Sequence, residues 1–119
     1  MGMIEELKNL GLDIDEGLDR VMGDASLYEM MLGMFVNSVR DNPVNPADFD
    51  GGDTDALIKA VHTLKGVTGN LAITPLFDGY TQTLVLLRAG QVKEAKAEFE
   101  RLLPAQAEIL ACINRHQSA

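Results

Sequence analysis

The sequence predicts an all-α protein, specifically an antiparallel four-helix bundle preceded by one or two short helices. Apolar residues recur every three or four positions along most of the chain, which is the period of an α-helix. No stretch alternates apolar and polar residues for long enough to predict a strand. The connections between helical stretches are short, which favours antiparallel neighbours in an all-α chain. The 119 residues are the length of one domain.

Two short helices are predicted at the start of the chain. Leu7 and Leu10 mark the first, which is expected to end before the glycine at position 11. The second is expected over residues 14 to 22 and ends at Gly23, because glycine readily adopts the left-handed conformation of a helix C-terminus.

A longer helix is predicted to follow, with Asp24 as its N-cap. Its apolar residues at helical spacing are Leu27, Met30, Met31, Met34, Phe35 and Val39. The three methionines are predicted to fill gaps in the core, as methionine commonly does. Asn42-Pro43 ends this helix, and residues 43 to 53, rich in proline, glycine and aspartate, are predicted to form a loop.

The next helix is predicted to begin at Asp53 or Thr54, either of which can cap it. Five of its residues fall within a narrow arc of the helix and are expected to face the core: Leu57, Val61, Leu64, Thr68 and Leu71. The arc therefore fixes which residues of this helix point toward solvent.

Two further helices are predicted in the last third of the chain. Thr74-Pro75 marks the start of one, because proline is favoured at the first helical position, and Gly90 follows its end. The apolar residues of the last helix are Val92, Ala95, Phe99, Leu102, Ile109 and Ile113. Pro104 lies inside this helix and is expected to kink it.

Composition argues against several classes of function. Eighteen acidic residues against ten lysines and arginines give a net charge of -8, which disfavours binding to nucleic acid or to anionic membranes. No apolar stretch is long enough to span a bilayer, so we expect a cytoplasmic protein. Cys112 is the only cysteine and excludes an internal disulfide. Cys112 and His116 are four residues apart, but two ligands make a poor metal site, so none is predicted.

The most informative pattern surrounds His62, at the edge of the apolar arc of the helix that begins near Asp53. Residues three and four positions away share its face, and they are Ile58, Lys59, Lys65 and Gly66. A glycine inside a helix costs roughly 1 kcal/mol relative to alanine. Gly66 leaves no side chain over the imidazole, so a reactive group on another protein could approach it. The ammonium of Lys65 could then stabilise the oxygens of a phosphoryl group.

The segment from His62 to Gly66, His-Thr-Leu-Lys-Gly, followed by Gly69-Asn70-Leu71, resembles the histidine signature of histidine-containing phosphotransfer (HPt) domains. Residues 17 to 35 are similar to the N-terminal pattern of that family, and the resemblance covers roughly residues 12 to 112. It implies a four-helix bundle whose exposed histidine exchanges a phosphoryl group with the aspartate of a response-regulator receiver domain.

By this resemblance, His62 is the phosphoacceptor, Lys65 stabilises the phosphoryl group and Gly66 gives steric access. The flanking residues Ile58, Lys59, Gly69 and Asn70 are assigned to partner binding, with Gly69 equally suited to close helix packing. The resemblance implies that the partner receiver supplies the Mg²⁺, so this chain needs no cofactor, and a hybrid sensor histidine kinase is one source of such a receiver. Some family members place a glutamine on the next helix near the histidine. Counting puts that position close to Leu84, with Gln82 as a possible stand-in.

Two alternatives remain open at this point. The chain could be a helical docking or structural bundle in which His62 has no chemical role, or the phosphoacceptor domain of a larger sensor histidine kinase. The double glycine Gly51-Gly52 lacks the lysine and hydroxyl residue of a phosphate-binding loop, and no hydrolase triad is recognisable. The sequence therefore favours a phosphoryl carrier in a two-component phosphorelay over an enzyme.

Overall fold

The computed structural model describes residues 2 to 117, and all regular secondary structure in that range is helical. It comprises α1 (Met3–Asn9), α2 (Ile14–Asp19), α3 (Ala25–Asp41), the 3₁₀-helix η1 (Pro46–Asp50), α4 (Thr54–Asn70), α5 (Thr74–Arg88) and α6 (Val92–Gln117). The predicted all-α class is therefore confirmed. No helix within residues 2 to 117 combines the length and apolar character needed to cross a membrane.

Helices α3 and α4 each begin at an aspartate whose side chain caps the first turn. The Asp24 carboxylate accepts a hydrogen bond from the Leu27 amide at 3.1 Å, and the Asp53 carboxylate accepts one from the Ala56 amide at 3.0 Å. Each bond satisfies one of the amide groups that the first turn of a helix leaves without a partner. Both predicted caps, at the starts of α3 and α4, are confirmed.

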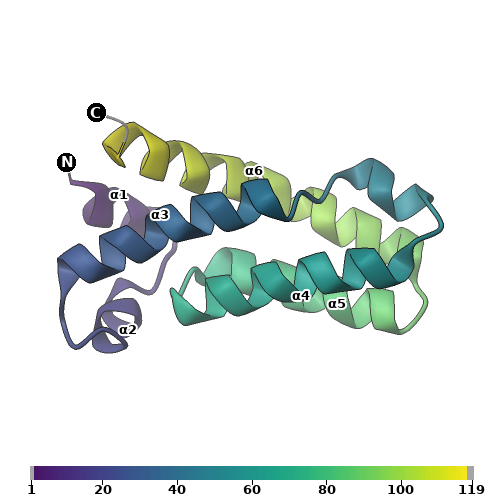
Figure 1. The fold of residues 1–119 in the computed structure, drawn as a ribbon, viewed down its shortest axis with the longest axis horizontal. Helices are drawn as coiled ribbons and strands as arrows, with labels where there is room; N and C mark the ends of the chain where they lie inside the picture. Colours follow the sequence, from purple (N-terminus) through teal and green to yellow (C-terminus); the bar gives the residue numbers. More distant parts are fainter. Residues whose placement is uncertain (1, 118–119) are drawn as a thin grey trace.

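The long helices α3 to α6 lie roughly along the longest axis of the molecule, and each reverses the direction of the one before it (Figure 1). Helix α5 packs against both α4 and α6, while α3 makes fewer contacts with α4 and α6. The short α1 packs on α6, and α2 lies between α1 and α3 in the chain and contacts both. Helix α1 and the last turns of α6 lie at the same end of the molecule (Figure 1).

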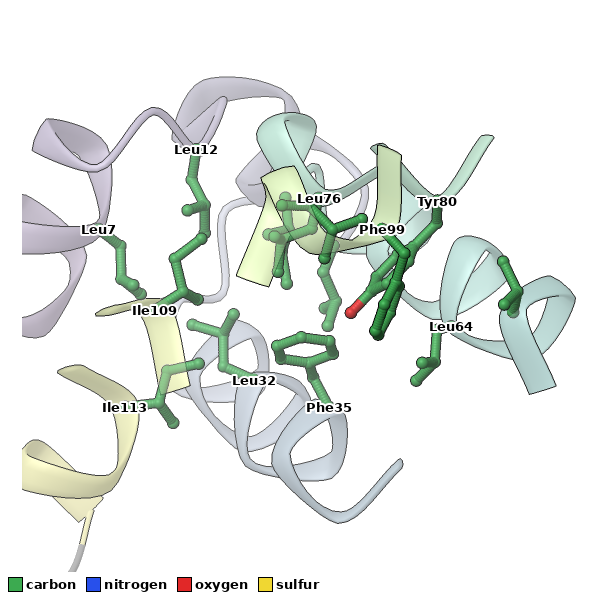
Figure 2. Packing of buried hydrophobic residues seen from close by; sticks show 14 of the residues in the cluster. Leu7, Leu12, Leu32, Phe35, Leu64, Leu76, Tyr80, Phe99, Ile109 and Ile113 are labelled. Carbon is green, nitrogen blue, oxygen red and sulfur yellow. The ribbon is translucent and has the colours of Figure 1, made fainter. Parts of the chain in front are cut away.

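The core is formed by apolar side chains from all of these helices. Figure 2 shows Leu32 and Phe35 of α3 lying near Ile109 and Ile113 of α6. The larger residues that are almost completely buried are Tyr28, Tyr80, Phe35, Phe99, Leu7, Leu32, Leu64, Leu71, Ile73, Leu76, Leu84 and Ile109. The buried cluster begins at Met3, so helix α1 contributes to it ahead of residue 12, where the resemblance to the HPt family begins.

The buried face of α3 differs from the predicted one. Tyr28, Leu32 and Phe35 are buried, whereas Met30 and Met34 are 58% and 57% exposed and Met31 is half-buried. The prediction that the methionines fill the core was therefore wrong for Met30 and Met34. The face formed by Tyr28, Leu32 and Phe35 lies in the core instead, and the Tyr28 hydroxyl has a buried hydrogen-bond acceptor there.

Two segments differ from prediction in their local structure. Helix α2 ends at Asp19, and residues 20 to 23 form turns, so the helix is shorter than predicted. The stretch from 43 to 53, predicted as a loop, contains η1, which buries Phe49 against Phe99 with ring centroids 5.3 Å apart. Helix α6, by contrast, remains helical across Pro104.

Candidate functional site

Helix α4 places His62 on the surface because of its apolar pattern. Leu57, Val61, Leu64 and Thr68 are buried, as predicted, and His62 follows Val61 by one position, so its side chain is exposed. The hydroxyl of Thr68 donates to the carbonyl oxygens of Leu64 at 2.9 Å and of Lys65 at 3.1 Å. This polar residue can therefore lie on the buried face without an unsatisfied hydroxyl.

A surface hollow of about 540 Å³ opens beside His62, and we call it the His62 hollow. It lies where α4 meets α2 and α5. The α4 residues lining it include His62, Lys65, Gly66, Gly69 and Asn70, and other segments contribute Glu16, Arg20, Phe77 and Asp78. The structure thus brings together five of the seven predicted site residues.

The imidazole of His62 and the ammonium of Lys65 have no hydrogen-bond or ion-pair partner among residues 2 to 117. His62 is exposed and Lys65 is half-buried. Both polar groups are therefore available to a ligand or partner in the hollow.

The two glycines of the motif differ in their surroundings. A Cβ atom at Gly66 would meet nothing within 4 Å, so the space above this residue is open. A Cβ atom at Gly69 would lie 2.9 Å from a ring carbon of Phe77, which indicates close packing of α4 against α5. Gly66 therefore fits the predicted access role, and Gly69 fits the packing role that the sequence left open.

One wall of the hollow comes from α2, which is fixed to the end of α4. The Asp13 amide donates to the Ala72 carbonyl at 3.0 Å, and the hydroxyl of buried Tyr28 donates to the Leu71 carbonyl at 2.7 Å. A Cβ atom at Gly17 would lie 2.6 Å from the Tyr28 ring, so α2 packs directly on that ring. Burial raises the pKa of Tyr28 to about 12, because the phenolate would lose its contact with water.

This wall carries a charged pair that sequence reasoning did not assign to the site. The Arg20 guanidinium donates to the Glu16 carboxylate at 3.1 Å, and both side chains are about half exposed. Arg20 lies within the segment that resembles the HPt family. It is 42 positions before His62, and no sequence pattern indicated that the two residues line the same hollow. Phe77 and Asp78 of α5 were also missed, because no local pattern around them indicated a site.

The remaining predicted residues lie outside the His62 hollow. Ile58 is half-buried and packs against the core, and Lys59 is exposed. Leu84, close to which counting put the glutamine of some HPt domains, is buried. Gln82 is exposed and has no hydrogen-bond partner among the described residues 2 to 117. Gln82 therefore does not orient His62 in this structure.

The charged side chains that line the hollow balance one another. Lys65 and Arg20 supply two positive charges, and Glu16 and Asp78 supply two negative ones. Because Arg20 is paired with Glu16, Lys65 is the lining cation that has no ion-pair partner among residues 2 to 117. A nucleophilic imidazole next to a cation is an arrangement that can receive a phosphoryl group.

Comparison with protein-family models, with curated proteins and with solved structures finds no match for this chain.

Proposed function

We propose that this protein is a histidine phosphotransfer module of a two-component phosphorelay, with the four long helices forming an antiparallel bundle. His62 would carry a phosphoryl group between the aspartates of response-regulator receiver domains. The observation that carries the proposal is the combination in one hollow of an exposed, unpartnered imidazole, an unpartnered lysine one turn away and open space at Gly66.

The chemical step follows from these groups. The ring nitrogen of His62 that holds the lone pair attacks the phosphorus of an aspartyl phosphate on the receiver. A nitrogen–phosphorus bond forms, the phosphorus–oxygen bond to the aspartate breaks, and the aspartate leaves as a carboxylate. The proton on the other ring nitrogen stays in place, so no separate base is required.

Lys65 and Arg20 contribute electrostatically to this step. The transferred group carries negative charge on three oxygens, and phosphoryl transfer depends mainly on positioning and on stabilisation of that charge. The Lys65 ammonium is free to reach these oxygens, because it has no ion-pair partner within residues 2 to 117. Arg20 can approach them by exchanging its contact with Glu16 for the phosphoryl group.

The protein would act as a carrier in the cytoplasm and would need no cofactor of its own. The receiver would supply the acceptor aspartate and Mg²⁺, and a hybrid sensor histidine kinase is one source of such a receiver. The docking surface would centre on the His62 hollow, with Asn70 and the half-exposed Phe77 at its edge. Neither nucleic acid nor a membrane would be a partner.

The proposal is tested by phosphoryl transfer to the full chain. Phosphorylated receiver domains are incubated with the wild-type protein and with His62→Gln, and the products are analysed by intact mass before and after mild acid. We expect one acid-labile phosphoryl group on the wild type and none on His62→Gln.

His116→Gln is the matched control, because it removes the only other histidine and leaves the His62 hollow intact. It should accept the phosphoryl group as the wild type does. Labelling of His62→Gln, or no labelling of the wild type by any receiver tested, would favour the alternative of a docking or structural bundle. Labelling by a kinase catalytic domain with ATP, but by no receiver, would favour the phosphoacceptor domain of a sensor kinase.

A further inference from the structure

A second group of polar side chains lies far from His62 in the fold, where α1 packs on α6. The Glu6 carboxylate of α1 accepts a hydrogen bond from the Cys112 thiol at 3.3 Å, and its same oxygen, Oε2, lies 3.3 Å from Nε2 of His116. The Arg115 guanidinium also donates to this oxygen. Three potential metal ligands of different chemistry therefore converge on one point.

We propose that Glu6, Cys112 and His116 form a binding site for Zn²⁺. A thiolate, an imidazole nitrogen and a carboxylate oxygen are the three ligand types that protein zinc sites use. The sulfur, a ring nitrogen of His116 and a carboxylate oxygen all lie within 4.8 Å of one another.

Two of the three donor separations match a tetrahedral zinc site. With zinc–ligand bonds of roughly 2.0 to 2.3 Å, neighbouring ligand atoms of a tetrahedron are about 3.3 to 3.6 Å apart. The sulfur-to-oxygen and nitrogen-to-oxygen separations are both 3.3 Å, and the sulfur and the ring nitrogen lie within 4.8 Å of each other. Rotation of the side chains would bring the three atoms to tetrahedral spacing around a zinc ion.

The fold supplies the third ligand, which the sequence pattern does not. Cys112 and His116 are one helical turn apart on α6 and lie on the same face, so they were visible as a pair in the sequence. Glu6 lies 106 residues before Cys112 and reaches the pair only because α1 packs on α6.

The site opens onto the surface of the molecule. A hollow of about 380 Å³ is lined by Glu6, Cys112 and Glu108. The fourth position of a tetrahedron would be open to a water molecule from this hollow. The Arg115 guanidinium can then hold the carboxylate oxygen of Glu6 that does not bind the metal, as outer partners of metal ligands commonly do.

Metal binding would displace a proton from Cys112. Zinc binds the thiolate form of cysteine, so the thiol proton must leave when the metal binds. Coordination forms a zinc–sulfur bond and releases one proton to solvent, with no change in oxidation state. The affinity for Zn²⁺ should consequently rise as the pH rises from 6 to 8.

The test uses the full-length reduced protein and Co²⁺ as a spectroscopic substitute for Zn²⁺. We expect Co²⁺ to produce the near-ultraviolet charge-transfer absorption of a cobalt–thiolate bond, to saturate at one equivalent and to be displaced by Zn²⁺. Zn²⁺ should also raise the melting temperature. No thiolate absorption in the wild type, with folding verified by circular dichroism, would overturn the proposal.

Variants separate this site from other metal binding and from phosphotransfer. Cys112→Ser should lose the charge-transfer band and the zinc-dependent rise in melting temperature, and His116→Gln should weaken Co²⁺ binding at least tenfold while retaining its fold. His62→Gln is the control and should bind Co²⁺ like the wild type, whether or not His62 accepts a phosphoryl group. A zinc-dependent rise that persists unchanged in both Cys112→Ser and His116→Gln would contradict the assignment.

Discussion

Lys65 and Lys59 lie three residues after and three residues before His62 on the same helix, but only Lys65 lines the His62 hollow. Replacement of Lys65 by alanine should slow phosphoryl transfer from a phosphorylated receiver, because a positive charge near the transferred oxygens is lost. It should change the free energy of unfolding by no more than about 0.5 kcal/mol.

Stopped-flow transfer and urea denaturation of Lys65→Ala measure the two effects separately. Lys59→Ala is the matched control and should transfer at the wild-type rate, since Lys59 is exposed and does not line the hollow. Equal rates for the two alanine variants would remove Lys65 from the transfer step.

Gly66 and Gly69 offer a second comparison on the same helix face. Gly66→Ala should raise the free energy of unfolding by up to about 1 kcal/mol, because its new methyl group meets open space and alanine favours the helix. Gly69→Ala should be less stable than Gly66→Ala, because its methyl group would press on the Phe77 ring. Gly66→Ala should nevertheless transfer more slowly, because the methyl group obstructs the receiver.

Thermal melts and transfer rates on both glycine variants test these expectations. A Gly66→Ala protein that transfers at or above the wild-type rate would show that this glycine is not required for access.

The residue pattern around His62 could be predicted because it is local. Helical periodicity alone placed Val61 in the core and His62 at the surface, and the one-turn spacing of Lys65 and Gly66 followed directly. Arg20 and Phe77 reach the same hollow through contacts between helices, which periodicity does not encode. The zinc ligand Glu6 was missed for the same reason.

At the scale of the helices, Tyr28 connects α3 to the end of α4. Tyr28→Phe removes the hydroxyl that donates to the Leu71 carbonyl and leaves that buried acceptor without its partner. The free energy of unfolding should fall by about 1 to 3 kcal/mol. Urea denaturation at neutral pH measures this change.

Tyr80→Phe is the control for Tyr28→Phe, because it removes a hydroxyl from an equally buried tyrosine. The Tyr80 hydroxyl donates to the side chain of Gln106, which is half-buried and can turn toward solvent when its partner is lost. Tyr80→Phe should therefore lower the free energy of unfolding less than Tyr28→Phe does. A Tyr28→Phe protein as stable as the wild type would show that the Leu71 carbonyl finds another donor.

Element types were predicted more reliably than the buried face of one helix. Asp24 and Asp53 marked the starts of α3 and α4, because capping depends on residues within the first turn. In α3, however, two apolar stripes compete, and the sequence gives no reason to prefer Tyr28 over Met30 for burial. The hydrogen bond to Leu71, 43 residues away, favours the tyrosine and is visible only in the fold.

The whole molecule should lose stability in alkaline solution. Burial raises the pKa of Tyr28 to about 12 and raises that of Tyr80 above its ordinary value. An unfolded tyrosine has a pKa of about 10, so above pH 10 the unfolded chain loses these protons before the folded protein does. Stability is therefore fully present below pH 10 and falls as the pH rises toward 12, by up to about 1.4 kcal/mol per pH unit for each tyrosine.

Urea denaturation between pH 8 and 11.5 measures this slope. In a Tyr28→Phe, Tyr80→Phe double variant the fall above pH 10 should be much smaller, although the variant is less stable at neutral pH. An equal slope in the two proteins would assign the alkaline loss to other groups.

The contact between α1 and α6 joins Glu6 to Arg115, which are 109 residues apart, and so closes almost the whole chain into one loop. Ordering such a loop has a large entropic cost before any contact repays it, so α1 should dock after α3 to α6 have assembled. Contacts that form after the rate-limiting step govern how fast a protein comes apart, and hardly affect how fast it folds. Replacing buried Leu7 by alanine should therefore increase the unfolding rate constant and leave the refolding rate constant unchanged. An ion held between Glu6 and α6 would slow the detachment of α1, and would therefore lengthen the lifetime of the folded protein.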